Sequence, residues 1–376
     1  MGKNTNILDT ITTAKPHTIK KFELISRYVY DWAHKILGYS KSKGVIYIDC
    51  MSNCGMYYDE QGKLIEGTAI RVVKLLDEII SQYPGKKAIL YFNDINKARV
   101  EKLKEFINSA NCKNVETYYN VGDGNQFLHS LNVGRFSFFN TLMVYDPYNA
   151  NIDWNAIAPY LNIWGEVIIN HIISDTVRGS HVAQKSSAIS KYQDTYQKSI
   201  DEIVALGCDR KKLDQIVVDI IKEQTIESKR ERFIASFPFF NRNNGQVYNL
   251  IHCCGNIEGL KLYKKVAWQT FGGKSSLKNT HGIENQLCLG FDDNAPIHTI
   301  TDESCFFVKD IAKYVFDNYS RRGTVSLEDI YLDLDRHPIF PSDGFKREIK
   351  DELKSSYGVS FPKGKNIAVF KSGVEL

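Results

Sequence analysis

The chain contains 376 residues, of which 43% are hydrophobic and 24% charged, and its formal net charge is +4. No apolar run approaches the roughly 20 residues that a membrane span requires. No secretory signal opens the chain, and the eight cysteines lack the spacing of a disulfide framework. These features exclude a membrane span and a disulfide-stabilised secreted fold, and they predict a cytoplasmic protein. The length predicts two domains, because domains of about 100–200 residues are typical.

Five strands that alternate with helices are predicted in the first half of the chain. The run Val45-Ile46-Tyr47-Ile48 is uninterrupted by charge, which is typical of a parallel strand covered by helices on both faces. The alternation predicts an α/β fold with an open, doubly wound Rossmann-like sheet. We expect helices over residues 18–37, 68–81 and 97–110, and strands over residues 45–48, 88–92, 115–119, 138–145 and 167–170.

A helical insertion and a closing hairpin are predicted to complete this sheet. Residues 184–232 are polar, helical in period and nearly balanced in charge, which indicates the insertion. Residues 247–253 and 265–271 have the apolar character of two strands that close the sheet as a hairpin. The pattern therefore predicts a Rossmann-like domain of residues 1–295.

A small second unit is predicted from residue 301 to the end of the chain. Its helices are expected over residues 305–319 and about 345–356, and Ser326 is expected to cap a further helix between them. Short apolar segments at 359–361 and 367–370 flank a Pro-Lys-Gly-Lys turn, which indicates a β-wing. Residues 301–376 are therefore predicted to form a winged-helix-like domain.

Carboxylates follow four of the predicted strands, at the edge where ligands bind in an open doubly wound sheet. They are Asp49, Asp94, Asp123 and Asp146. Asp94 stands where an acid can accept hydrogen bonds from ribose hydroxyls, and Asp123 stands where it can receive an adenine amine. The alternative for Asp94 is the N-cap of the next helix, and the alternative for Asp123 is a turn residue.

The turn after the first strand is a candidate cofactor-binding loop. A cofactor with an adenosine moiety needs a tight turn of small residues there, so that the backbone can approach it. Ser52, Asn53 and Gly55 can form such a turn after Asp49, because Asn tolerates the left-handed conformation that Gly favours. The alternative is an ordinary strand-to-helix loop.

Asp146, Pro147 and Tyr148 are the candidate catalytic residues. Pro147 fixes the backbone after the fourth strand, so that Asp146 can project into the crevice and hold a target amine. Tyr148 can stack on an extruded base. The alternative for this motif is a capped strand end. His171, after the fifth strand, is either a base or a structural histidine.

The cysteines do not predict a metal site. Cys50 and Cys54 lack the third cysteine of a radical-type iron–sulfur motif, because Tyr57 occupies that position. Cys253 and Cys254 lack partners at zinc spacing. We expect small residues in turns rather than metal ligands.

These motifs, in this order, resemble the three-Cys-motif partner proteins (TcmP), a family distantly similar to ribosomal-RNA adenine methyltransferases. The resemblance covers most of the chain. Asn53 departs from the family pattern, because it replaces the first Gly of the strand-one loop. One Pro is also missing before Tyr148, compared with the Asp-Pro-Pro-aromatic pattern of amino-methyltransferases. The resemblance is carried by residues 15–21, 49–57, 66–68, 92–94, 144–148, 259–260, Trp268 and 301–376.

The resemblance implies an S-adenosylmethionine-dependent methyltransferase that acts on RNA or DNA at an amine. Lys and Arg outnumber acids within residues 1–44, and Lys20 and Lys21 are therefore candidate phosphate contacts. A solvated basic helix face is the alternative for these two lysines.

The family name also implies a partner, a radical-enzyme-like protein with three cysteines. A second hypothesis is therefore a catalytically degenerate module that docks this partner. The helix predicted near residues 345–356 supports it, because its basic and acidic residues balance, whereas a DNA-gripping winged helix presents a basic helix.

Overall fold

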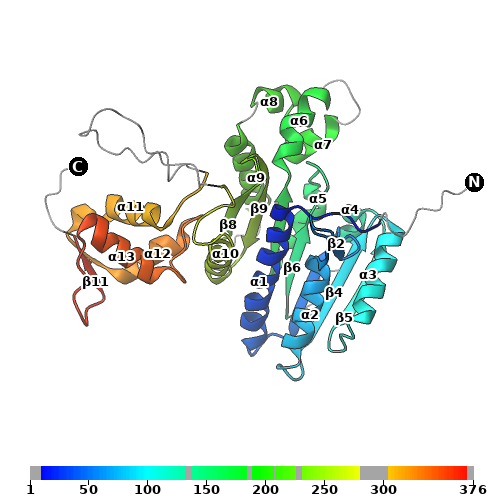
Figure 1. The fold of residues 1–376 in the computed structure, drawn as a ribbon, viewed down its shortest axis with the longest axis horizontal. Helices are drawn as coiled ribbons and strands as arrows, with labels where there is room; N and C mark the ends of the chain where they lie inside the picture. The colour runs from blue at the N-terminus through cyan, green and yellow to red at the C-terminus, as the bar shows by residue number, and fades with distance from the viewer. Residues whose placement is uncertain are drawn as a thin grey trace, which may run out of the picture.

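A seven-stranded mixed sheet forms the centre of the molecule in a computed structural model, which describes residues 10–131, 138–183, 189–206, 209–225, 231–279 and 304–370 (Figure 1). The strand order is β5-β4-β1-β6-β7-β9-β8. The first five strands in this order are parallel, and β9 runs antiparallel to both of its neighbours. The strands are β1 (Gly44–Asp49), β4 (Lys87–Asp94), β5 (Glu116–Val121), β6 (Phe139–Tyr145), β7 (Gly165–His171), β8 (Phe233–Phe240) and β9 (Gln246–Cys254).

The central strand β1 explains why helices cover both faces of the sheet. All six of its residues are buried. Val45 and Tyr47 pack into one hydrophobic core, whereas Ile46 and Ile48 pack into the other, because successive strand residues point to opposite faces. A strand with two buried faces has no polar alternation, which is why the apolar run identified it.

Helices from different parts of the chain form the two outer layers. The first layer contains α1 (Pro16–Gly38), α2 (Thr68–Ile80), α3 (Lys97–Ser109) and α10 (Ile257–Thr270). The second contains α4 (Gly124–Ser130), α5 (Trp154–Leu161), α7 (Ile189–Tyr196), α8 (Ile200–Ala205) and α9 (Arg210–Thr225). Helix α6 (Ile173–Ala183) follows β7, and a small hairpin of β2 (Met56–Tyr58) and β3 (Leu64–Glu66) follows the β1 loop.

The predicted Rossmann-like sheet is confirmed, with all five predicted parallel strands in place. The helical insertion is present as α7 to α9 between β7 and β8, although residues 184–188, 207–208 and 226–230 lie outside the described residues. The closing hairpin also exists, but one of its two strands was misplaced.

The prediction of a strand over residues 265–271 is wrong, because these residues form the end of helix α10 and the residue after it. The helix begins after Asn256, whose side chain caps it, and its buried residues recur at helical spacing from Leu260 onward. The true partner of β9 is β8, which the sequence pattern missed. Pro238 lowers the strand signal of β8, and it is tolerated there because β8 lies at the edge of the sheet.

Three helices and a two-stranded sheet make up the C-terminal unit. They are α11 (Val308–Tyr319), α12 (Leu327–Arg336), α13 (Lys346–Tyr357), β10 (Thr324–Ser326) and β11 (Ile367–Val369). Ser326 caps α12 as predicted. Strand β11 pairs with β10, and Ser360 forms a single bridge to Val369, so of the two segments predicted for a β-wing only the second is a strand. Residues 301–303 lie outside the described residues.

The C-terminal unit packs directly on helix α10 of the first layer (Figure 1). The ring of Trp268 lies 5.6 Å from that of Phe345 and 6.4 Å from that of Phe340, measured between centroids. Lys264, fully buried in the same helix, donates hydrogen bonds to four backbone carbonyls at and after the end of α12. The two predicted domains thus share a hydrophobic core. In the described part of the chain, no helix has the length and apolarity needed to cross a bilayer.

Candidate cofactor and active site

Three carboxylates converge at the carboxyl edge of the sheet. Asp49 ends β1, Asp94 ends β4 and Asp146 follows β6, and these three strands are adjacent in the sheet. Asp49 and Asp94 are buried, with 5% and 1% of their surfaces exposed. Burial raises the pKa of Asp49 to about 7, and the negative charge of Asp146 adds to the effect. Crowded carboxylates of this kind favour a positively charged ligand.

Lys21 supplies the counter-charge to this cluster. Its ammonium donates to Asp146, and Asn170 of β7 donates to the other carboxylate oxygen. Lys21 is 7% exposed, so it faces the crevice rather than a phosphate at the surface. Lys20 lies at the surface and pairs with Glu23. Of the two predicted phosphate contacts, only Lys20 therefore lies where a nucleic acid can reach it.

The loop after β1 folds as the tight turn that the sequence suggests. Asn53 adopts the left-handed conformation with a φ of 58°, and its side-chain oxygen accepts from the backbone N–H of Cys54 at 2.7 Å. Ser52 donates from both its backbone and its hydroxyl to the carbonyl of Asn93. Asn53 donates its backbone N–H to Asp94 at 3.0 Å. The loop is thus tied to the end of β4.

Gly55 closes this turn with a φ of 78°, and a Cβ atom there would lie 2.5 Å from Leu103 and 2.9 Å from Ile70. We expect Gly55→Ala to lower the free energy of unfolding by about 2–4 kcal/mol, because backbone strain adds to a steric clash. Gly62 is a matched control, since its φ is also 78° and nothing lies within 4 Å of its Cβ position. Gly62→Ala should cost only about 1 kcal/mol in the same urea titration. Equal losses in both variants would contradict the packing role of Gly55.

Asp94 already uses most of its hydrogen-bonding capacity. One oxygen accepts from the backbone of Asn53 and, at 3.4 Å, from the hydroxyl of Tyr148. The other accepts from the backbone of Asn96 at 2.9 Å and lies 3.9 Å from Arg99. The side chain that caps α3 is Asn96, not Asp94. Asp94 instead fixes the two loops that border the crevice.

Tyr148 and Arg99 lie over this carboxylate. The guanidinium of Arg99 is 5.5 Å from the centre of the Tyr148 ring and also donates to its hydroxyl. Tyr148 is 61% exposed, so the pair forms a cover that solvent reaches from outside.

Asp123 caps helix α4, because its side chain accepts from the backbone N–H groups of Asn125 and Gln126. Asp123, Asp94, Pro147 and Tyr148 all line a cavity of about 150 Å³ at the carboxyl edge. Small-molecule sites usually measure about 300–1,000 Å³. This cavity can therefore hold only part of a nucleoside cofactor while Tyr148 stays where it is.

The structure divides the predicted site into two groups. Asp94, Asp123, Pro147 and Tyr148 line the cavity. The other predicted residues form the packed floor beside it, where Asp49 and Asp146 repel each other and the β1 loop is tied down. This floor holds Asp49, Ser52, Asn53, Gly55, Asp146 and Lys21.

Several other chemically capable side chains have structural contacts instead. His171 is fully buried, with Asp214 3.1 Å from one ring nitrogen and Tyr196 2.8 Å from the other. Cys50 and Cys54 donate to backbone carbonyls at 3.2 and 3.1 Å, as residues of a turn do. Sequence reasoning missed Arg99 and Asn170; only their positions after β4 and within β7 could have indicated them.

In comparisons with known proteins, the chain is similar to solved structures at low sequence identity. No protein-family model and no curated protein match the chain. Three of these solved structures serve as examples. The first is WbdD, the second is an rRNA methylase from Streptococcus thermophilus, and the third is the O-methyltransferase TomG from Streptomyces achromogenes in complex with SAM. Their identities are 11%, 10% and 12%, and their TM-scores 0.33, 0.28 and 0.31. The alignments cover 63%, 60% and 61% of this chain, but 35%, 94% and 79% of the other chains.

Because these TM-scores are low, we define the fold by the strand order of the sheet. Five parallel strands in the order β5-β4-β1-β6-β7 give the doubly wound arrangement, and an antiparallel hairpin closes it. The sheet is therefore Rossmann-like. Its carboxyl edge, where the predicted residues gather, is the edge at which ligands bind in such sheets.

Proposed function

We propose that the protein is an S-adenosylmethionine-dependent methyltransferase that acts on an amine of a nucleic acid. The observation that carries the proposal is the cluster of Asp49, Asp94 and Asp146 at the carboxyl edge. S-adenosylmethionine carries a sulfonium and an ammonium, and both positive charges suit a crevice in which three carboxylates outnumber the two cations Lys21 and Arg99. When bound, this cofactor supplies the electrophilic methyl group.

The residues of the chain then have distinct roles. Asp94 and Asp123 are placed to accept hydrogen bonds from the hydroxyls and the amine of an adenosine, once Tyr148 moves aside. Asp49 faces the positive charge. Asp146 holds the target amine, and Lys21 marks the position that this amine takes, because it is a nitrogen donor on the same carboxylate. Alignment of the amine within attack distance supplies much of the rate.

Binding of S-adenosylmethionine should depend on pH because of Asp49. Its pKa of about 7 in the free protein means that part of the population is protonated at neutral pH. A cation favours the ionised carboxylate, so binding below pH 7 must displace a proton. Affinity should therefore rise from about pH 6 to about pH 8, with a limiting slope of about tenfold per pH unit below the pKa.

Calorimetric titration of S-adenosylmethionine into wild type and Asp49→Asn measures this effect. The variant should bind at least about tenfold more weakly and lose the pH dependence. Asp317→Asn is the matched control, since Asp317 lies on the exposed side of α11 and pairs with Lys313. No binding to the folded wild type at either pH would retire the enzyme proposal.

A second function, a docking module related to the three-Cys-motif partner proteins, is favoured by the occupied state of Asp94 and the small cavity under Tyr148. The basic residues of α13 support it, because Lys346 and Lys354 pair with Asp343 and Asp351. Co-purification with a radical-enzyme-like protein of three cysteines, without cofactor binding, would favour this function. Stable binding of S-adenosylmethionine without such a complex would count against it.

A further inference from the structure

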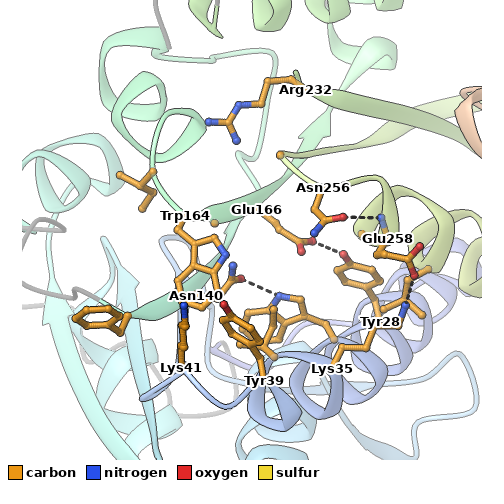
Figure 2. A pocket seen from close by; sticks show the side chains of 18 residues that line it. Tyr28, Lys35, Tyr39, Lys41, Asn140, Trp164, Glu166, Arg232, Asn256 and Glu258 are labelled. Atoms are coloured by element: carbon orange, nitrogen blue, oxygen red, sulfur yellow. Dashed lines mark hydrogen bonds and ion pairs between the residues drawn. The ribbon is translucent and has the colours of Figure 1, made fainter. Parts of the chain in front are cut away.

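A second cavity, much larger than the first, lies at the opposite edge of the sheet. Its volume is about 920 Å³, within the range of small-molecule sites. Its walls come from the starts of β6 and β7, the second half of α1 and the beginning of α10 (Figure 2). Each strand is seven residues long, so this edge lies about 20 Å from the carboxylate cluster. The cavity is therefore independent of the proposed methyltransferase site.

The floor of this cavity presents both a hydrogen-bond acceptor and a hydrogen-bond donor. Glu166 is 8% exposed, and one of its oxygens accepts from Tyr28 and lies 2.8 Å from His252. Its other oxygen has no hydrogen bond within the described chain. Asn140 accepts from the indole of Trp32 at 3.1 Å, which leaves its amide N–H groups available. A carboxylate acceptor and an amide donor thus lie on the floor, as Figure 2 shows.

The rim is aromatic and exposed to solvent. Tyr39 is 50% exposed, Trp164 39% and Phe138 55%. Tyr39 and Trp164 meet edge to face with 6.4 Å between their centroids, and the solvent-exposed part of the indole can stack on a planar ligand. Phe138 has a φ of 71°, an unfavourable conformation for a bulky residue. Such strain concentrates at functional sites.

Arg232 gives the strongest indication of an anion-binding group. Its Nε and one terminal nitrogen are buried and have no hydrogen-bond partner in the described part of the chain. Figure 2 places its guanidinium across the cavity from Tyr28 and Lys35. A buried guanidinium without an acceptor is costly, and an anion would satisfy it. Lys41, exposed at the same rim, adds positive charge.

We propose that this cavity binds a nucleotide, with the base between Trp164 and the floor and the phosphate on Arg232. Three features of the cavity match such a ligand. The indole can stack on a planar base, the free carboxylate oxygen of Glu166 can accept from an exocyclic amine of that base, and the unpaired guanidinium can bind the phosphate. Adenosine monophosphate is the probe that carries such a base and a phosphate. The free nucleotide and the same nucleotide within a single strand share this chemistry.

The first experiment titrates adenosine monophosphate while Trp fluorescence is recorded. Wild type should bind it more tightly than uridine monophosphate, which has no exocyclic amine, and more tightly than inorganic phosphate. Arg232→Met should weaken binding about tenfold or more, and should leave binding of adenosine itself unchanged. Arg242→Met is the matched control, because Arg242 lies just beyond the other end of β8 and pairs with Glu60 at the surface.

A second pair of measurements separates the two sources of the ligand and guards against misfolding. An oligoadenylate that binds more tightly than the mononucleotide, with affinity that falls steeply with salt, would identify a nucleic-acid strand. Equal affinities would identify the free nucleotide. Arg232→Met should not lower the free energy of unfolding, since the guanidinium has no hydrogen-bond partner to lose within the described residues. Trp164→Leu should also weaken the binding of adenosine monophosphate, because it removes the stacking surface. Wild type that binds no adenine nucleotide, or Arg232→Met that binds as wild type does, would overturn the proposal.

Discussion

Replacing Lys21 by Met should lower the free energy of unfolding by about 2–3 kcal/mol, somewhat less than removing one partner from a fully buried ion pair, because Asp146 is partly exposed. Lys21 is the ammonium that faces Asp146, and its charge also opposes the rise in the pKa of Asp49. Without it, two carboxylates repel each other in a buried crevice. The Asp49 pKa should then rise further, and urea unfolding at neutral pH should show the loss.

The neighbouring lysine provides the control for this prediction. Lys20→Met should change stability by less than about 0.5 kcal/mol, because Lys20 is 40% exposed and its pair with Glu23 is a surface one. The double variant Lys21→Met with Asp146→Asn should recover much of the loss, since no unpaired charge remains beside Asp49. A single variant as stable as wild type would show that Asp146 is not held by this pair.

The residues at the carboxyl edge could be predicted from sequence because the end of each strand is visible in the local sequence. A strand ends where its apolar run ends, so Asp49, Asp94 and Asp146 could be placed on one edge once the strands were recognised as parallel. The left-handed Asn53 was suggested by residue type alone and is present. What the sequence could not supply is which side chains point at one another.

Lys21 illustrates this limit. Its sequence neighbours made it one of two equivalent lysines on a basic helix, whereas the packing of α1 on the sheet turns it inward and leaves Lys20 outside. The same holds for the edge strand β8, whose Pro238 lowers the local signal, and for the second cavity, whose walls come from segments over 200 residues apart. Long-range packing decides β8 and the second cavity. For Lys21, helical spacing does hold the information that it faces inward, because Lys21 lies four and seven residues before the buried Ile25 and Tyr28.

Replacing Lys264 by Met should loosen the packing of helix α10 against the C-terminal unit. The ammonium lies 2.7–2.9 Å from the carbonyls of Leu334, Asp335, His337 and Phe340. Two of these carbonyls belong to the last turn of α12, where the Leu334 carbonyl also accepts from the cap N–H of His337 and the Asp335 carbonyl has no other donor within the described residues. The lysine therefore caps α12 from another element, and its positive charge suits the negative end of the helix dipole.

Loss of this ammonium removes the donor of the Asp335, His337 and Phe340 carbonyls, whereas Leu334 keeps the N–H of His337, and we expect about 3–5 kcal/mol of destabilisation. The effect should concentrate in the C-terminal unit, so amide exchange in residues 327–345 should accelerate more than in β1. Lys265→Met is the control, because Lys265 is 34% exposed and lies 3.8 Å from Asp31. If amide exchange in residues 327–345 were as slow in both variants as in the wild type, α12 would not depend on this cap. If only Lys264→Met loosened the C-terminal unit, this buried lysine would be needed, beside the Trp268 contacts, to hold that unit on α10.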